Sequence, residues 1–513
     1  MSTRKLMQDG CLAAVLAAAL GASIITPSAV RADEAAQDAE AAPRRFVTEG
    51  SGTFGGERLR YRATVQEHIL TSPAGEAAAS VFTTAYVRTD ARGADRPVMF
   101  AFNGGPGSSS IWLHLGYLGP QRVDFDDPAQ PRTVAPFTMT ANPDSPLDVA
   151  DIVLIDPPGT GYSRVLPGGR TEQFYGVTQD ATAVMQVIRQ WLEANHRQNS
   201  PKFLISESYG TVRAAALAKL LAGGPFGTGA MEAITLNGII LVGQSMDGSA
   251  RGGGDGDDRP YLQLLPSFAA TACYFGKAEA GCTPEGQTEA ARRFNREIYL
   301  PALYEGSALS ETERRRVAEG LSALTGLAAS DILANDLRVS VKTFSESLLA
   351  DRGQKVGVYD SRFVLPRRRS GGDPVADDPA MTQYVPGFVG AWSDYARDVL
   401  KVETGRTYEA IAFREVNAKW DYGFGPGVPG GRNHAVDLAV AMTRNQSLRL
   451  LVATGYYDLQ TPVGEAEYTI THAGVPLDRT LFRNYPSGHM PYLGRDSREA
   501  LTRDVRAFLR NDR

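Results

Sequence analysis

The stretch Phe203-Leu204-Ile205-Ser206-Glu207-Ser208-Tyr209-Gly210 is the most informative part of this sequence for the fold. An apolar run leads into a turn, and a helical pattern follows from residue 212. In a nucleophile elbow, a strained turn lifts a serine out of a sheet, and small residues flank it two positions away on each side. Ser206 and Gly210 meet this requirement around Ser208, although a serine replaces the usual first glycine. A serine in this place can also simply cap a helix, so the interpretation depends on the rest of the chain.

Short apolar strands alternate with helical patterns on both sides of this stretch. Continuous apolar runs of this length favour strands that are buried on both faces of a parallel sheet. The predicted strands are Pro97–Phe102, Asp151–Ile155, Phe203–Ile205, Leu236–Val242 and Leu448–Ala453. Helical patterns at 178–195 and 212–222 give the βαβ rhythm of an α/β domain.

The βαβ rhythm stops after Val242 and resumes near His434. Between them lie Gly- and Asp-rich residues, several helical patterns and a polar, Pro-containing stretch. We therefore predict an α/β domain made of residues 46–246 and 431–513, with a largely helical inserted cap at 247–430.

The N-terminus has the pattern of a secretory signal peptide. Arg4 and Lys5 precede an apolar, Ala-rich run that ends in small residues before Ala32. We predict a signal peptide at 1–32, a flexible leader at 33–45, and a protein exported to the periplasm or the extracellular space. The alternative is an uncleaved anchor, but the run falls short of the about 20 apolar residues that a comfortable span needs. No later stretch suits a bilayer, so no stable membrane span is expected after cleavage.

Composition and cysteine count restrict the possible partners. The 513 residues are 43% hydrophobic and 22% charged, with a net charge of −5, so we expect no nucleic-acid binding. Export favours a disulfide between Cys273 and Cys282, the alternative being two free thiols. Oligomeric state cannot be read from these features.

A glycine-rich loop, Asn103-Gly104-Gly105-Pro106-Gly107-Ser108-Ser109-Ser110, follows the first predicted buried strand. Glycines allow the backbone to turn sharply and to approach a ligand closely. Such a loop can supply one N–H of an oxyanion hole, and the residue after the nucleophile supplies the other. A plain β-turn before a helix is the alternative, whereas a P-loop is excluded because no Gly-Lys-Ser/Thr follows.

An acid and a base follow Ser208 in the chain. Asp458 ends the segment Gly455-Tyr456-Tyr457-Asp458, and His489 lies in a loop after a possible strand at 480–484. A catalytic serine needs a base, and that base needs a carboxylate to orient it. The order Ser208, Asp458, His489 is the order found in α/β-hydrolases. His472 is the other candidate base, and we expect it on the surface.

Taken together, these motifs resemble the serine carboxypeptidases (peptidase family S10), and specifically an exported bacterial member. The motifs that carry the resemblance are Asn103–Ser109, Asp156-Pro157-Pro158-Gly159-Thr160-Gly161-Tyr162-Ser163, Glu207–Tyr209, Gly455–Asp458 and Gly488-His489-Met490. The resemblance implies an α/β-hydrolase fold with Ser208 as nucleophile, His489 as general base and Asp458 as its orienting acid. It also implies an oxyanion hole formed by the backbone N–H groups of Gly105 and Tyr209.

The resemblance further implies a site for the C-terminal carboxylate of a peptide. Asn103, Gly104 and Glu207 match its positions, and Tyr117 stands where the family has a glutamate. Because Glu207 would face another carboxylate, we expect its pKa to be raised and binding to be favoured at acidic pH. Three departures are Ala101 for a family tryptophan, Ser108 for a family cysteine, and Gly210-Thr211 for Ala-Gly.

We therefore predict a serine carboxypeptidase that releases C-terminal amino acids from peptides through an acyl-enzyme at Ser208. Neither a metal nor an organic cofactor is expected, since no Cys/His cluster has zinc spacing. One alternative is an esterase or acyltransferase that uses the same residues on another acyl group. A third reading, a secreted binding protein without activity, disagrees with the presence of all three catalytic residue types.

Overall fold

The computed structural model places the chain in two units, Met1–Ala41 and Ala42–Arg513. The described residues are 42–511, apart from 73, 92, 94, 126–130, 229–233, 249–255, 369–370 and 424–430. The predicted signal peptide and most of the predicted leader lie outside these residues. The first strand begins at Arg45, the last residue of that leader.

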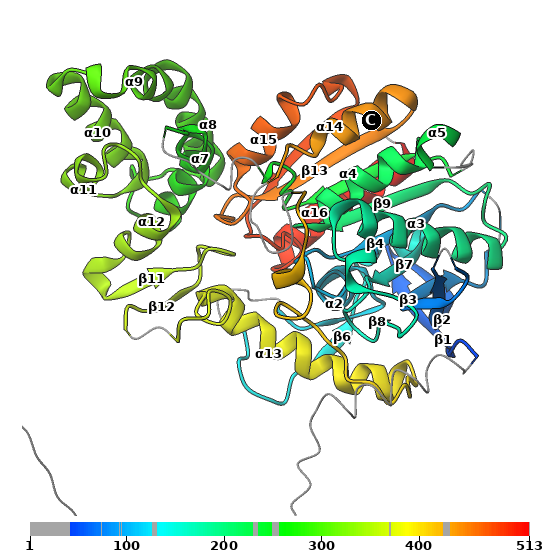
Figure 1. Ribbon diagram of the computed structural model, residues 1–513. Coiled ribbons are helices and arrows are strands. Elements are labelled where there is room, and N and C mark those ends of the chain that lie inside the picture. Colours follow the sequence, from blue (N-terminus) through cyan, green and yellow to red (C-terminus); the bar gives the residue numbers. More distant parts are fainter. Residues whose placement is uncertain are drawn as a thin grey trace, which may run out of the picture. The chain divides into compact units, whose positions relative to one another are not determined.

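A ten-stranded mixed sheet forms the centre of the second unit (Figure 1). Its order is β1-β2-β3-β7-β4-β9-β10-β13-β14, with β8 paired to β3. The strands are β1 (Arg45–Phe54), β2 (Glu57–Thr71), β3 (Ala77–Arg88), β4 (Val98–Phe102), β7 (Asp151–Asp156), β8 (Arg164–Val165), β9 (Lys202–Glu207), β10 (Gly238–Val242), β13 (Arg449–Gly455) and β14 (Thr480–Tyr485). All pairings from β7 to β14 along this path are parallel. The predicted α/β class with a mostly parallel sheet is confirmed.

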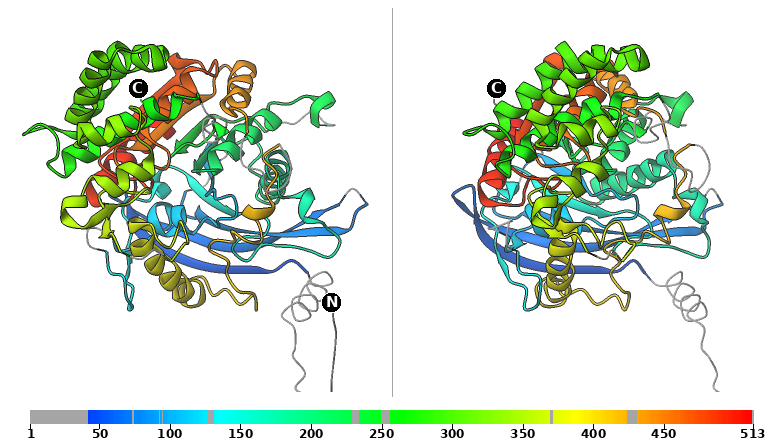
Figure 2. Two further views of the ribbon diagram at one scale, coloured as in Figure 1. Left: turned by 60° about the vertical axis from the view of Figure 1, so that its left-hand side comes forward. Right: turned by 90° about the vertical axis from the view of Figure 1, so that its left-hand side faces the viewer.

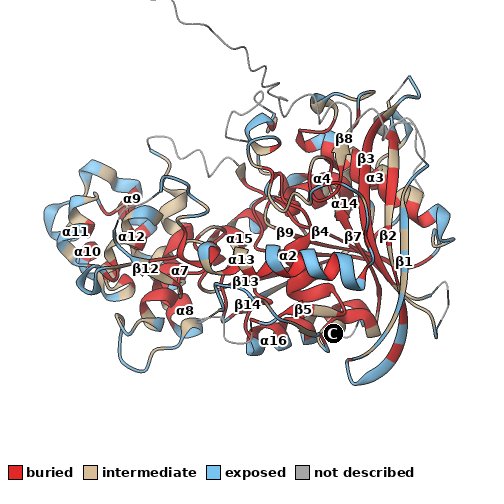
Figure 3. Ribbon diagram, turned by 90° about the horizontal axis from the view of Figure 1, so that it is seen from below, coloured by how far each residue is buried: buried red, intermediate tan, exposed pale blue. Residues whose placement is uncertain are grey.

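The central strands are buried on both faces because their side chains alternate between two apolar cores (Figure 3). On β4, Phe100 packs in one core, where its ring lies 5.6 Å from Trp191, and Met99 packs in the other. The first core is covered by α3 (Val177–Ala194), α4 (Gly210–Leu221), α14 (Ala435–Arg444) and α15 (Val463–Thr471). The second is covered by α2 (Ile111–Leu113), α13 (Pro379–Asp394) and α16 (Arg495–Arg510).

The segment 247–430 contributes to three cores, and Ala412, Val416 and Trp420 near its end pack in the first sheet core. Its first part has a core of its own and forms one group of helices (Figure 2). These are α7 (Arg259–Tyr274), α8 (Pro284–Phe294), α9 (Leu300–Glu305), α10 (Glu311–Thr325), α11 (Ala329–Ala334) and α12 (Val341–Ser347). The hairpin of β11 (Gln354–Val356) and β12 (Val364–Pro366) follows. By contrast, α13 packs in a sheet core, and single β-bridges join Ile411 to Ser108 and Glu409 to Gly161. The domain boundaries drawn from the sequence stay a prediction.

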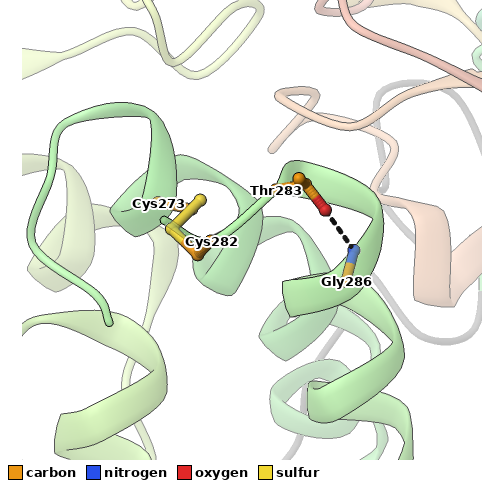
Figure 4. The surroundings of a disulfide bond; sticks show 4 residues. All are labelled: Cys273, Cys282, Thr283 and Gly286. Carbon is orange, nitrogen blue, oxygen red and sulfur yellow. Dashed lines mark hydrogen bonds between the residues drawn. A yellow bond between two sulfur atoms is a disulfide. The ribbon is translucent and has the colours of Figure 1, made fainter. Parts of the chain in front are cut away.

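Cys273 and Cys282 form a disulfide near the facing ends of α7 and α8 (Figure 4), as predicted. The bond spans a sequence separation of 9 residues and lies where α7 gives way to the turn before α8. Thr283 then caps α8, because its hydroxyl accepts the N–H of Gly286 at 3.1 Å.

Within the described ranges, the structure contains no helix with the length and apolar character needed to cross a bilayer.

Candidate active site

Ser208, the predicted nucleophile, stands between the end of β9 and the start of α4. Its φ of 58° lies in the left-handed region, which a residue with a Cβ rarely adopts, so the turn is strained. The Ser208 N–H donates to the carbonyl of Val242 at 3.0 Å. A Cβ on Gly210 would lie 3.0 Å from the carbonyl oxygen of Phe102, which explains the small residue there. This is the geometry of a nucleophile elbow, and it brings Ser208 into a cavity.

Asp458 and His489 come from the loops after β13 and β14, at the same edge of the sheet as Ser208. The Nδ1 atom of His489 lies 2.9 Å from Oδ2 of Asp458. His489 lines the same cavity as Ser208, and Asp458 is fully buried. His472 is exposed at the end of α15, as expected for a surface histidine. The structure therefore brings together the three residues predicted for the catalytic triad.

Thr461 is a member of this cluster that the sequence analysis did not single out. Its hydroxyl donates to Asp458 Oδ2 at 2.5 Å and lies 3.0 Å from His489 Nδ1. The backbone N–H groups of Gln460 and Thr461 both donate to Asp458 Oδ1 at 2.8 Å. The available signal was a hydroxyl residue three positions after the acid, in a turn that folds back on it.

The glycine-rich loop and the elbow lie in direct contact. A Cβ on Gly104 would lie 2.4 Å from the backbone nitrogen of Tyr209, and Gly105 has a φ of 100°. Within the described part of the chain, the N–H groups of Gly105 and Tyr209 have no protein acceptor. Both residues line the cavity beside Ser208, so their N–H groups are placed where an oxyanion hole is expected.

The cavity has a volume of about 400 Å³ and opens over Ser208 and His489. Its walls are largely apolar and aromatic, and part of them comes from the later half of segment 247–430, through Val375, Met381, Ile411 and Phe413. None of its described lining residues is a lysine or an arginine. A negatively charged ligand in this cavity would therefore be held by neutral donors, by a protonated acid or by the histidine rings of His434 and His489.

Glu207 and Asn103 are two of the buried polar side chains that line the cavity. Burial raises the pKa of Glu207 to about 7, although nearby His489, a hydrogen bond from Tyr492 and the Asn103 side chain all act to lower it. Asn103 Oδ1 accepts the N–H of Leu113 at 3.0 Å. Its Nδ2 group lies near enough to Glu207 to lower the pKa of that acid, but it forms no hydrogen bond of good geometry among the described residues and can still donate to a ligand.

Tyr117 does not reach the cavity, so its predicted contact with a substrate carboxylate is wrong for this structure. It is fully buried and is not one of the cavity residues. Its ring instead stacks on that of Tyr492, with centroids 6.0 Å apart and an interplanar angle of 8°. The hydroxyl of Tyr492 donates to Glu207 Oε2 at 2.6 Å. Thus Tyr492, which the sequence analysis missed, stands between Tyr117 and the predicted site.

The family model described as serine carboxypeptidase matches residues 78–250. This segment contains the glycine-rich loop, the elbow and the strands that carry them. The chain is a serine hydrolase. The match supports the resemblance to the serine carboxypeptidases for this part of the hydrolase, and β13, β14, Asp458 and His489 lie beyond it.

One of the solved structures that resemble this chain supports the α/β-hydrolase fold. Kex1(Δp), a prohormone-processing carboxypeptidase from Saccharomyces cerevisiae, is 15% identical, with a TM-score of 0.54 over 88% of this chain and 92% of that one. Proline iminopeptidase from Mycobacterium smegmatis is 12% identical, with a TM-score of 0.35 over 87% and 98% of the two chains. A carboxyl esterase from Bacillus coagulans is 13% identical, with a TM-score of 0.35 over 87% and 98%. Among curated proteins, no relative matches the sequence.

Proposed function

We propose that the hydrolase is a serine carboxypeptidase that removes C-terminal amino acids from peptides and works best at acidic pH. One observation carries the proposal. A buried carboxyl group, Glu207, lies directly before the nucleophile, and the cavity around it has no lysine or arginine among its described lining residues. A protonated carboxyl can donate a hydrogen bond to a substrate carboxylate without charge repulsion.

The triad geometry supports an acyl-transfer mechanism. Ser208 Oγ attacks the carbonyl carbon of the last peptide bond while His489 Nε2 takes the hydroxyl proton. Asp458 accepts the N–H of His489 Nδ1, so the ring proton stays on Nδ1 and Nε2 remains free to act as the base. The N–H groups of Gly105 and Tyr209 bind the oxyanion, and His489 then gives its proton to the leaving amine. Water repeats these steps on the ester and releases the shortened peptide.

The carboxylate of the substrate would bind between Asn103 Nδ2 and Glu207. The terminal carboxyl of a peptide is ionised above about pH 4. Glu207 remains protonated below its pKa of about 7 and loses its proton above that value. Between these limits one proton is shared by two carboxyl groups, which is favourable. At higher pH two negative charges would meet in a buried site, so binding should weaken.

The proposal predicts a pH-dependent preference for a free carboxylate. For an N-blocked dipeptide and its C-terminal amide, we expect the ratio of the two kcat/KM values to be high at pH 5 and to fall through about pH 7. The ratio is the appropriate measurement because the ionisation of His489 affects both substrates and cancels. In Glu207→Gln, the side-chain amide donates at every pH, so the fall near pH 7 should disappear.

One outcome would contradict the carboxypeptidase assignment, and another would contradict the role of Glu207 in it. A ratio near one at all pH values, together with good hydrolysis of simple esters, would favour the esterase alternative. A fall near pH 7 that persists in Glu207→Gln would mean that another group recognises the carboxylate. Loss of the fall only in Glu207→Gln would support the proposed site.

We further propose that the protein is exported. The signal-peptide pattern of residues 1–32 and the disulfide between Cys273 and Cys282 support this, because disulfides persist in oxidising compartments. Protein recovered from the periplasmic or culture fraction should begin at Asp33 by intact mass. A chain that keeps residues 1–32 and sediments with membranes would contradict cleavage and favour an anchor.

A further inference from the structure

Among the described residues, Tyr492 donates a side-chain hydrogen bond to Glu207 and does not line the cavity. It follows His489 by three residues, in the loop between β14 and α16. Its hydroxyl donates to Glu207 Oε2 at 2.6 Å, and its side chain is fully buried. Tyr492 therefore contacts Glu207 from outside the cavity, and Glu207 is the residue that can contact a ligand.

The packing around Tyr492 leaves its ring little freedom. The ring stacks on Tyr117 at an angle of 8°. A Cβ on Gly116 would lie 2.4 Å from the Tyr492 ring, so the absence of a side chain at that position makes room for it. Tyr117 and Gly116 thus fix the ring, and the ring fixes the hydroxyl on one oxygen of Glu207.

The Tyr492 hydroxyl remains a donor at every pH at which the enzyme works. Burial and the neighbouring Glu207 raise the pKa of Tyr492 well above its usual range. Since Oε2 is occupied by this bond, the proton of a neutral Glu207 is directed to Oε1, where it can serve a ligand. When Glu207 is ionised, the same bond stabilises its charge. The other groups that act on Glu207 are His489, Asp458 and Asn103.

We propose that Tyr492 is a positioning residue that sets the pH range over which the hydrolase accepts a free C-terminal carboxylate, through its hydrogen bond to Glu207. The inference rests on the proposed carboxypeptidase function. It extends that function by assigning the control of substrate recognition to a residue that does not itself touch the substrate.

The test is the change Tyr492→Phe, which keeps the ring and its stack and removes only the hydroxyl. Without this donor the ionised form of Glu207 is less stable, so Glu207 should hold its proton to higher pH. We expect the fall in the free-acid to amide ratio of kcat/KM to move up by about one pH unit, since a hydrogen bond to a charged group has about that effect. Tyr117→Phe is the matched control, because it removes a buried hydroxyl from the stacking partner and leaves the Glu207 bond in place. It should leave the ratio profile unchanged.

A second readout separates this inference from the proposed function. The protonation of Glu207 can be followed without substrate by infrared titration, with its carboxylic-acid band identified by its loss in Glu207→Gln. Tyr492→Phe should raise the midpoint of this titration by about one pH unit, as for the activity ratio. If the wild-type ratio shows no fall but the infrared midpoint moves, the proposed function fails while the role of Tyr492 on Glu207 holds. A midpoint that stays within about 0.2 unit, or moves down, overturns the inference, given the expected size of the effect.

Discussion

Ser208→Ala should lower kcat for every substrate of the hydrolase by about 10⁵- to 10⁶-fold. The change removes only Oγ, the atom that forms the acyl-enzyme, and alanine keeps the Cβ that already tolerates a φ of 58°. The Ser208 N–H bond to Val242 is a backbone contact and should survive. We therefore expect an unchanged melting temperature together with complete loss of labelling by a fluorophosphonate probe.

The matched control for this change is Ser245→Ala, which alters another serine that lines the same cavity. The backbone N–H of Ser245 donates to Thr211 Oγ1 at 3.0 Å, and the substitution does not touch this bond. Its labelling should stay close to that of the wild type. If Ser208→Ala still labelled, or if Ser245→Ala did not, the nucleophile would be wrongly assigned.

The second large effect is expected for Asp458→Asn, which should lower kcat by about 10⁴-fold. The backbone N–H groups of Gln460 and Thr461 hold Oδ1, so an asparagine would keep its oxygen there and place its NH₂ group at the position of Oδ2. His489 Nδ1, 2.9 Å from that position, would then have to accept a hydrogen bond. The ring proton would move to Nε2, and His489 could no longer take the proton of Ser208.

Probe labelling and thermal unfolding together distinguish a misoriented His489 from a loss of folding in Asp458→Asn. The rate of labelling by the probe should fall by a factor similar to that of kcat, while cooperative thermal unfolding persists. Asp504→Asn, which changes a partly exposed acid on α16, should leave both rates close to those of the wild type. Normal labelling of Asp458→Asn would show that Asp458 does not orient the base.

Local sequence patterns were sufficient to predict the strands and helices that carry the catalytic residues. The strands predicted at 97–102 and 448–453 occur as β4 and β13, and the helix predicted at 178–195 occurs as α3. Strands buried on both faces leave a continuous apolar signal, and the elbow requires small residues at fixed spacing. The order of Ser208, Asp458 and His489 along the chain sufficed to predict their meeting, because the carboxyl ends of parallel strands lie at one edge of the sheet.

The contacts of the neighbouring residues had a weaker local signal or none. The spacing of Thr461 from Asp458 is visible in the sequence, but its contact with His489 appears only once the turn after β13 is folded. Tyr117 looked like a ligand for the substrate because of its place in the motif, but its ring is stacked on Tyr492, outside the cavity. Which of two tyrosines reaches Glu207 depends on packing between segments that are far apart in the chain.

The sequence by itself therefore determined the fold class, the order of the triad residues and the glycine-rich loop beside the elbow. These follow from periodicity and backbone conformation, which are properties of short segments. Only the tertiary structure decided that Tyr492 holds Glu207, that the described cavity lining has no lysine or arginine, and that the later half of segment 247–430 lines the cavity. The physical reason is that burial and hydrogen-bond partners depend on contacts between distant parts of the chain, which no local pattern encodes.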